Sequence, residues 1–295
     1  MDAITATDLV RTFGSTRALD GFSLRVSEGE ARGFLGPNGS GKSTTIRILL
    51  GLLRQDSGTV RVLGSDPWDD PVPLHRRIAY VPGETALWPN LTGGEVIDIL
   101  THHHPHSRAR RDALVERFEL DPTKKTRAYS KGNRQKIPLI AALAADVELY
   151  VFDEPTSGLD PLMEAVFTDE VRALTAKGRT ILLSSHILAE VEKLCSSVTI
   201  IRSGTDVETG TLSDLRHLTR SRVTATVSAN PASLDHPAIH NLAVDGARIA
   251  FDCEDAQIGS VMPLLAGLGV RNLTVNPPSL EEVFLQHYGD PTVGR

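Results

Sequence analysis

Cysteine is scarce in this chain of 295 residues, which has only Cys195 and Cys253. The two lie far apart and neither belongs to a CxxC pair. This spacing excludes a disulfide-rich scaffold and a cysteine-ligated zinc site. Unpaired thiols are typical of proteins in a reducing compartment, so we expect a cytosolic protein.

The sequence also lacks a long apolar run. The most extended one, residues 137–152, is interrupted by Asp146 and Glu148, whereas a bilayer-spanning helix needs about 20 predominantly apolar residues. The first residues, MDAITATDLVRTFG, have neither the basic start nor the apolar core of a signal peptide. We therefore expect any contact with a membrane to depend on a partner protein.

Positive charge is not in excess either. The chain has 31 Lys and Arg residues against 37 Asp and Glu residues, a formal net charge of −6. This balance gives no overall attraction to nucleic acid, and no nucleic-acid partner is expected. The length suffices for one large domain and one small one.

Glycine is concentrated in residues 36–44, which read GPNGSGKST and match the phosphate-loop pattern GxxxxGK[ST]. In such a loop, backbone N–H groups turn toward a phosphate chain at the start of a helix whose N-terminus favours anions. An ordinary glycine-rich turn is the alternative. Against it, an apolar run ending at Leu35 precedes the loop, and an apolar-faced helix over 44–50 follows it.

The phosphate-loop pattern assigns roles to individual side chains. Lys42 is predicted to reach the β- and γ-phosphates, and the hydroxyl of Ser43 to bind Mg²⁺. The predicted nucleotide-binding residues of the loop are Gly36, Pro37, Asn38, Gly39, Ser40, Gly41, Lys42, Ser43 and Thr44.

Two adjacent carboxylates, Asp153 and Glu154, follow a four-residue apolar run. Carboxylates at the end of a buried strand are costly unless a cation uses them. Asp153 is predicted to help hold Mg²⁺, directly or through water. Glu154 is predicted to orient and deprotonate the water that attacks the γ-phosphate. The alternative is that the pair caps the helix after Pro155.

Two further stretches complete an ordered set of motifs: YSKGNRQK (129–136) and SSH, which ends at His186. With GPNGSGKST and VFDEPTSGLD (151–160), they make residues 1–220 resemble the nucleotide-binding subunit of an ATP-binding cassette (ABC) transporter. YSKGN stands in the place of the family's LSGGQ signature. The closing stretch PPSLEEVFLQ (277–286) is similar to the C-terminal extension of exporters of the daunorubicin-resistance type.

The resemblance implies a site shared between two subunits. It implies that Ser130 and Gly132 bind the γ-phosphate held by the opposite subunit, and that Asp160 lies in the loop through which the two sites sense each other. A serine followed by glycine at a helix start is a second anion site. Two anion sites in one chain make sense if two chains sandwich two ATP molecules by two-fold symmetry.

The resemblance further implies that Phe13 stacks on adenine, and that His186 contacts the γ-phosphate and holds the attacking water with Glu154. ATP and Mg²⁺ are the implied cofactors. Integral membrane permease subunits are the implied partners, and the cytoplasmic face of the membrane is the implied location. Phe13 as an ordinary core aromatic and His186 as a surface imidazole are the alternatives.

The signature departs from the family's pattern at Tyr129 and Lys131, which stand for its leading leucine and second small residue, and two positions outside the signature depart as well. A glutamine usually follows YVP, reaching Mg²⁺ and relaying the nucleotide state to the membrane subunit, but here Gly83 stands there and Glu84 follows. Either Glu84 supplies the missing oxygen, or the metal keeps a water and the coupling loop relies on backbone. Pro138 falls inside the helix expected after the signature, where it removes a donor and is expected to kink the helix.

Strand-like runs that alternate with helices indicate an α/β fold with a mostly parallel sheet. The N-terminal strands resemble the family's antiparallel strands, and a helical insertion is expected at about 84–145. Residues 1–220 are expected to form the nucleotide-binding domain. Residues 221–295 are expected to form a small α+β domain, which is either a stabilising or dimer-forming appendage or a regulatory one. Its last helix is expected to start at a capping box, Ser279 to Glu282.

Two side-chain features remain open in the sequence. The cluster His102, His103, His104 and His106 suggests a metal site, but consecutive histidines point to different sides of a helix and Pro105 breaks it. Trp88 is either exposed where the family docks its membrane subunit or buried.

The sequence therefore predicts a Mg²⁺-dependent ATPase subunit of an ABC transporter, an exporter of drug-like or other hydrophobic compounds. A soluble cassette ATPase acting on ribosomes or DNA is one alternative, although the chain has one phosphate loop and no sustained heptads. An ATP-binding interaction subunit with little turnover is another.

Overall fold

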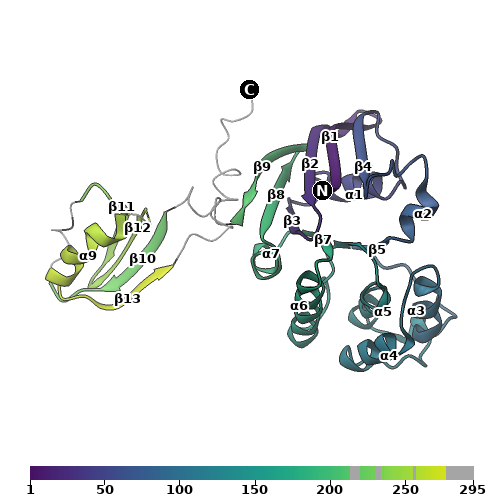
Figure 1. Ribbon diagram of the computed structural model, residues 1–295. Coiled ribbons are helices and arrows are strands. Elements are labelled where there is room, and N and C mark those ends of the chain that lie inside the picture. The colour runs from purple at the N-terminus through teal and green to yellow at the C-terminus, as the bar shows by residue number, and fades with distance from the viewer. Residues whose placement is uncertain (213–219, 230–233, 235, 255–256, 277–295) are drawn as a thin grey trace. The chain divides into compact units, whose positions relative to one another are not determined.

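The computed structural model describes residues 1–212, 220–229, 234, 236–254 and 257–276 (Figure 1). The chain divides into two compact units, Met1–Thr209 and Gly210–Arg295. This division falls earlier than the boundary predicted at residue 220. The capping box predicted at Ser279 and Glu282 lies outside the described residues.

The first unit is built on a six-stranded sheet with the strand order β5-β6-β7-β3-β8-β9. Its strands are β3 (Ala31–Leu35), β5 (Ile78–Val81), β6 (Leu149–Asp153), β7 (Thr180–Ser185), β8 (Ser197–Arg202) and β9 (Thr205–Thr211). The pairs from β5 through β8 are parallel. Nearly every residue of β6, β7 and β8 is buried, as in a sheet covered on both faces. The predicted α/β class is confirmed.

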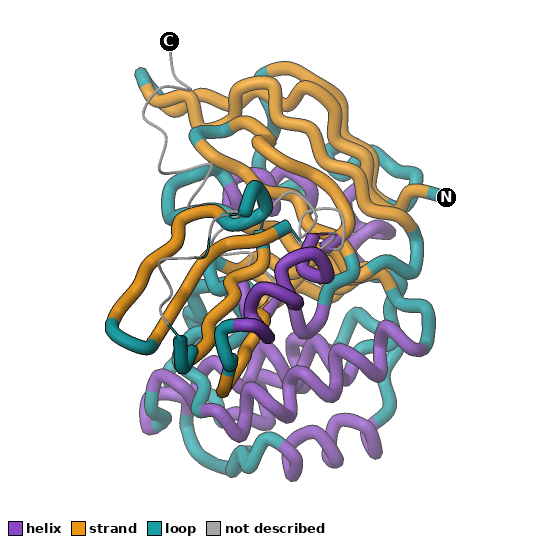
Figure 2. The backbone as a smooth tube through the Cα atoms, turned by 90° about the vertical axis from the view of Figure 1, so that its left-hand side faces the viewer, coloured by secondary structure: helices purple, strands orange, loops and turns teal. Residues whose placement is uncertain are grey.

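A second sheet of three antiparallel strands stands at one end of this unit. It consists of β1 (Asp2–Phe13), β2 (Thr16–Ser27) and β4 (Ser57–Val62), in the order β2-β1-β4. Figures 1 and 2 show these strands at the end of the unit opposite the helices α3, α4 and α5. The antiparallel N-terminal strands expected from the family resemblance are present.

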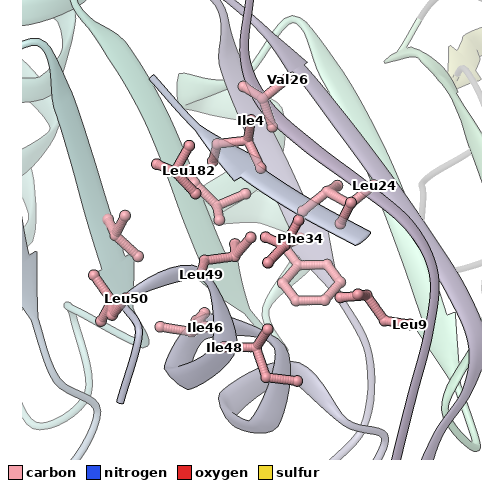
Figure 3. Packing of buried hydrophobic residues seen from close by; sticks show 14 of the residues in the cluster. Ile4, Leu9, Leu24, Val26, Phe34, Ile46, Ile48, Leu49, Leu50 and Leu182 are labelled. Atoms are coloured by element: carbon pink, nitrogen blue, oxygen red, sulfur yellow. The ribbon is translucent and has the colours of Figure 1, made fainter. Parts of the chain in front are cut away.

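The main core lies around helix α1 (Lys42–Leu49), which contacts strands of both sheets. Figure 3 shows Ile46 and Leu49 of α1 among side chains that include Phe34 of β3 and Ile4 of β1. These side chains are almost fully buried, and burying one of this size contributes about 1.5–3 kcal/mol. The phosphate loop is therefore anchored by the helix that follows it.

The helical insertion contains α3 (Gly93–Thr101), α4 (Arg108–Arg117), the short 3₁₀ helix η1 (Thr126–Ala128) and α5 (Lys131–Ala144). A capping box fixes the start of α3, where Thr92 and Glu95 bond each other's backbone N–H. Ser130 caps α5 by accepting from the N–H of Asn133. Helix α5 continues through the buried Pro138 to Ala144, so the proline does not end it.

The remaining helices of the first unit are α2 (Pro71–His75), α6 (Pro161–Ala176) and α7 (Leu188–Leu194). Helix α7 packs closely on the sheet, because a Cβ atom at Gly33 of β3 would come within 2.2 Å of Val191. Among the described residues, no helix is both long enough and apolar enough to cross a membrane.

The second unit contains a four-stranded antiparallel sheet with the order β11-β12-β10-β13 and one described helix, α9 (Ile258–Gly267). The strands are β10 (Ser221–Thr226), β11 (His240–Asp245), β12 (Arg248–Cys253) and β13 (Arg271–Asn276). Val223 and Phe251 of the sheet form a core with Val261 and Leu265 of α9. The unit has its own core and the α+β composition that was expected.

A buried ion-pair cluster joins the helical insertion to α6. The side chain of Glu170, in the middle of α6, is only 1% exposed. Its carboxylate accepts hydrogen bonds from Arg110 and Arg117 of α4. A carboxylate this buried is tolerated only where it is paired, so the two arginines are what allow an acid at this position.

Replacing both Arg110 and Arg117 with alanine is expected to lower the free energy of unfolding by about 3 kcal/mol, because Glu170 would stay buried without a partner. Urea denaturation measures this loss. Arg108→Ala, at the exposed start of the same helix, is the control and should change stability by less than about 0.5 kcal/mol. Equal values for the two variants would show that the pairing of Glu170 does not stabilise the fold.

Candidate active site

The phosphate loop follows β3 and has a backbone that only glycine fits at its key positions. A Cβ atom at Gly36 would lie 2.5 Å from the carbonyl oxygen of Ile201. Gly41 has φ +115°, and a Cβ atom there would lie 2.8 Å from the carbonyl oxygen of Ala18. Real Cβ atoms do not approach oxygen this closely, so these glycines are required by packing as well as by conformation.

Lys42 is held inside the loop. Its ammonium group donates to the carbonyl oxygens of Gly36 at 2.6 Å and Pro37 at 3.1 Å, and its side chain is 5% exposed. Burial lowers the pKa of Lys42, while the nearby charges of Glu154 and Asp153 oppose that shift. The ammonium therefore lies beside two carboxylates, at the place where the sequence predicts a triphosphate.

A buried polar atom in the loop also fits an anionic ligand. The hydroxyl oxygen of Ser40 is buried and has no hydrogen-bond partner in the described part of the chain. A buried hydroxyl without a partner costs free energy, which a phosphate oxygen could recover by accepting its hydrogen. Asn38 and Gly39 are exposed at the loop tip, and Thr44 lies in the first turn of α1.

Asp153 ends β6 and is oriented by two serines. Its Oδ2 atom accepts from the hydroxyl of Ser43 at 3.2 Å, and its Oδ1 atom from the hydroxyl of Ser184 at 2.7 Å. The contact with Ser43 brings together two of the three groups predicted to bind Mg²⁺. Ser184 escaped the sequence interpretation, although it lies two residues before His186 and is the register partner of Asp153 across β6 and β7.

Glu154 follows Asp153 in an unusual backbone conformation, with φ +48°. Its N–H donates to the carbonyl oxygen of Ser184 at 2.9 Å, which fixes the turn that a non-glycine residue rarely adopts. One of its carboxylate oxygens lies 3.2 Å from Nδ1 of His186, and the other lies 3.8 Å from Nζ of Lys42. The structure therefore brings Lys42, Glu154 and His186 together.

Position 83 faces this cluster without a side chain. A Cβ atom at Gly83 would lie 3.3 Å from the carbonyl oxygen of Asp153 and 3.7 Å from its Oδ2 atom. Burial, and then the charge of Asp153, raise the pKa of the neighbouring Tyr80 to about 12. A longer side chain at position 83 would therefore begin beside the carboxylate of Asp153. This is the position at which the family resemblance expects a glutamine that reaches Mg²⁺.

Glu84, the predicted replacement for this glutamine, lies beside the signature helix. Glu84 is exposed and lines a hollow with Lys131 and Arg134 of α5. The described residues contain no group of three or more acidic, histidine or cysteine side chains that could hold a metal ion. Mg²⁺ usually needs only one or two carboxylates, so the role of Glu84 stays a prediction.

Thr85 links the segment after Gly83 to the signature helix through its side chain. Its hydroxyl donates to Oε1 of the buried Gln135 at 2.7 Å, and Nε2 of Gln135 donates to the carbonyl oxygen of Pro155 at 3.5 Å. One amide therefore joins the segment after Gly83, the signature helix α5 and the residue that follows Glu154. This link escaped the sequence interpretation, because no local pattern pairs residues 85 and 135.

The residues predicted to act across a dimer lie at helix starts. Ser130 is the N-cap of α5, and Asp160 is the N-cap of α6, where it accepts from the N–H groups of Leu162 and Met163 at 3.0 Å. Gly132 is packed so tightly that a Cβ atom would lie 2.6 Å from the carbonyl oxygen of Gly158. Ser130 and Asp160 thus have capping roles within this chain, and their predicted roles at a nucleotide stay predictions.

Other sequence candidates are placed as follows. Phe13 is 46% exposed, and the guanidinium of Arg11 lies 4.9 Å from the centre of its ring, so Phe13 is not a core residue. The rings of His102 and His103 pack edge to face, and none of the four clustered histidines belongs to a metal-binding group within the described residues. Cys195 is buried, which raises the pKa of its thiol to about 12.

The chain has a glycine-rich loop in front of a buried helix, and two adjacent carboxylates at the carboxyl end of a parallel strand. This combination defines a phosphate-loop nucleotide-binding protein. The family model described as ABC transporter matches residues 19–157. Among similar proteins, the daunorubicin resistance ATP-binding protein DrrA3 of Streptomyces coeruleorubidus is 34% identical, over 98% of this chain and 96% of that protein.

Two further comparisons agree. The Nod factor export ATP-binding protein I of Rhizobium etli is 30% identical, over 98% of this chain and 94% of that protein. The solved structure of an ATP-binding subunit of an ABC transporter has a TM-score of 0.68 and 32% identity, over 73% of this chain and 92% of that one. The chain belongs to the ABC transporter family and is an ATP-binding subunit related to drug-resistance and export ATPases.

Proposed function

We propose that this chain is the Mg²⁺-dependent ATPase subunit of an exporter and hydrolyses ATP as a homodimer with membrane-spanning partners. The observation that carries the proposal is the convergence of Lys42, Asp153, Glu154 and His186 at the phosphate loop. A subunit that only binds ATP has no need of an acid beside a histidine at this place. The predicted subunit with little turnover is therefore the weaker alternative.

The residues suit the following division of labour in hydrolysis. The loop and Lys42 bind the β- and γ-phosphates, and the ammonium offsets their charge. Glu154 accepts a proton from the attacking water, and His186, 3.2 Å from Glu154, holds that water from the other side. The hydrogen bond from the N–H of Glu154 to the carbonyl oxygen of Ser184 fixes the backbone of this base.

The oxygen donors at the loop fit a magnesium ion. Ser43 and Asp153, whose oxygens lie 3.2 Å apart, would hold Mg²⁺, with Gly83 leaving the adjacent position to water. Hydroxyl and carboxylate oxygens are the ligands that Mg²⁺ prefers, and it usually keeps several waters. When bound, the ion supplies neutralising charge to the phosphate oxygens.

The proposed homodimer places the α5 start of one chain on the nucleotide of the other. Ser130 and Gly132 begin a helix of the insertion and not the helix of the phosphate loop, so one chain carries two separate anion sites. A two-fold axis that joins them would enclose two ATP molecules. Lys131 adds a cation beside Ser130.

The membrane partner is proposed to dock at an apolar hollow of about 340 Å³ between the sheet and the helical insertion. Leu52 and Trp88, which are 60% and 52% exposed, lie on its wall, and so does Pro138. Thr85 also lines it, so an occupant would contact the segment that Gln135 links to Glu154. An apolar segment of a permease fits this surface, and its binding would hold the chain at the cytoplasmic face of the membrane. The relatives' resistance and export names support an exporter.

Glu154→Gln is expected to slow ATP hydrolysis by about 10²- to 10⁴-fold, because it removes the proposed base, while ATP still binds. Steady-state phosphate release and nucleotide binding measure the two effects. Glu116→Gln, at an exposed acid of α4, is the control and should match the wild type. Unchanged turnover in Glu154→Gln would remove Glu154 from the mechanism.

Asp153→Asn is expected to raise the Mg²⁺ concentration for half-maximal turnover by at least about 10-fold, because the ion loses a charged ligand. Glu84→Ala is expected to leave that concentration unchanged, because Glu84 faces α5. Magnesium titrations of phosphate release measure both. A similar rise in the two variants would place Glu84 at the metal after all.

Trp88→Ala combined with Leu52→Ala is expected to reduce, by at least about 10-fold, binding to vesicles that contain the proposed permease, because the double variant loses exposed apolar contacts. Vesicle flotation measures the bound fraction. Leu242→Ala, an exposed apolar residue of the second unit, is the control. Wild-type binding by the double variant would exclude the hollow as the docking surface, and binding to vesicles without that protein would exclude a permease as the partner.

A further inference from the structure

Glu190, in the first turn of α7, contacts the two segments that carry the proposed catalytic groups. One carboxylate oxygen accepts from the hydroxyl of Thr156, which is 7% exposed. The other accepts from the hydroxyl of Ser185, which is 1% exposed, at 2.7 Å. Thr156 lies two residues after Glu154, and Ser185 directly precedes His186.

We propose that Glu190 is a positioning residue for ATP hydrolysis, which holds the loop after Glu154 and the end of β7 at a fixed separation. The proposal rests on the proposed ATPase function. Glu190 acts through Thr156 and Ser185 and does not itself contact the reacting groups.

The geometry around Glu154 explains why such a tie is needed. The left-handed backbone of Glu154 costs about 1–3 kcal/mol and persists only where its surroundings hold it. The N–H of Glu154 is held by Ser184, and its carbonyl oxygen by the N–H of Ser157 at 3.2 Å. The first bond holds only the start of the turn to β7, and the second lies within the turn, so neither keeps the residues after Glu154 from moving away from the end of β7.

Glu190 restrains that movement from the other face of the sheet. Successive residues of a strand point to opposite faces, so Ser184 and His186 face the phosphate loop while Ser185 faces α7. The N–H of Ile187 also donates to the hydroxyl of Ser185 at 2.9 Å, which tightens the chain just after His186. Each residue of the SSH motif thus contacts a different acid: Ser184 contacts Asp153, Ser185 contacts Glu190, and His186 contacts Glu154.

The chemistry of the carboxylate suits this position. Two buried hydroxyls each need an acceptor, and a carboxylate offers one oxygen to each. A glutamine can accept from one hydroxyl with its oxygen and donate to the other with its amide group. Glu190→Gln therefore keeps both segments connected, and alanine disconnects them.

Glu190→Ala is expected to lower kcat for ATP hydrolysis by about 10- to 100-fold, the size of effect that an ångström of misplacement has on a catalytic group. The Kd for ATP should change less than about 2-fold, because the phosphate loop is untouched, and Glu190→Gln should restore most of the rate. Glu164→Ala, at an acid of α6 that lines the same hollow as Glu190, is the control and should retain the wild-type rate.

A second measurement separates positioning from general stability. In the Glu154→Gln background, adding Glu190→Ala should change the residual single-turnover rate less than about 2-fold, because the group that Glu190 positions is already lost. A further 10-fold loss there would overturn the proposal. So would a wild-type kcat in Glu190→Ala, or a rate loss that glutamine does not restore. If the wild-type chain hydrolyses no ATP, it is the proposed function that fails.

Discussion

The site depends on the register between two buried parallel strands, β6 and β7. That register sets Asp153 opposite Ser184, and the hydrogen bonds from Ser184 to the side chain of Asp153 and from the backbone of Glu154 to Ser184 follow from it. A shift by one residue would turn every side chain of β7 to the other face. Because both strands are buried on both faces, such a shift would also misplace apolar side chains in the close-packed core, and the core therefore protects the chemistry.

Asp153 and Glu154 are stabilised by different kinds of neighbour, a cation for Glu154 and neutral hydroxyls for Asp153. Lys42 approaches Glu154 from the loop, and neutral hydroxyls hold Asp153. Lys42 and Glu154 form an ion pair at 3.8 Å, which offsets part of the cost of burying both charges.

Much of this arrangement could be predicted from the sequence, because it depends on local patterns. The loop at 36–44, the acids after β6 and the histidine after β7 each follow a strand that the apolar pattern reveals. The contacts of Ser184, Gln135 and Glu190 could not be predicted, because they join segments that only strand order and helix packing bring together. The role of Glu84 stays a prediction for a related reason: the direction of a side chain after β5 is set by the turn there and not by its neighbours in the sequence.

Helix α6 connects the loop that ends at Asp160 to the helical insertion, and it does so as a single stiff rod. Asp160 caps its first turn, and Glu170, ten residues later, is held by α4, so about 15 Å of helix separates the two acids. A rotation of the helical insertion would pull on Glu170 and tilt the whole rod. The displacement would reappear at Asp160, beside the face where a second copy of the chain is proposed to sit. A rotation of the helical insertion can thus displace Asp160 without any change in the six-stranded sheet.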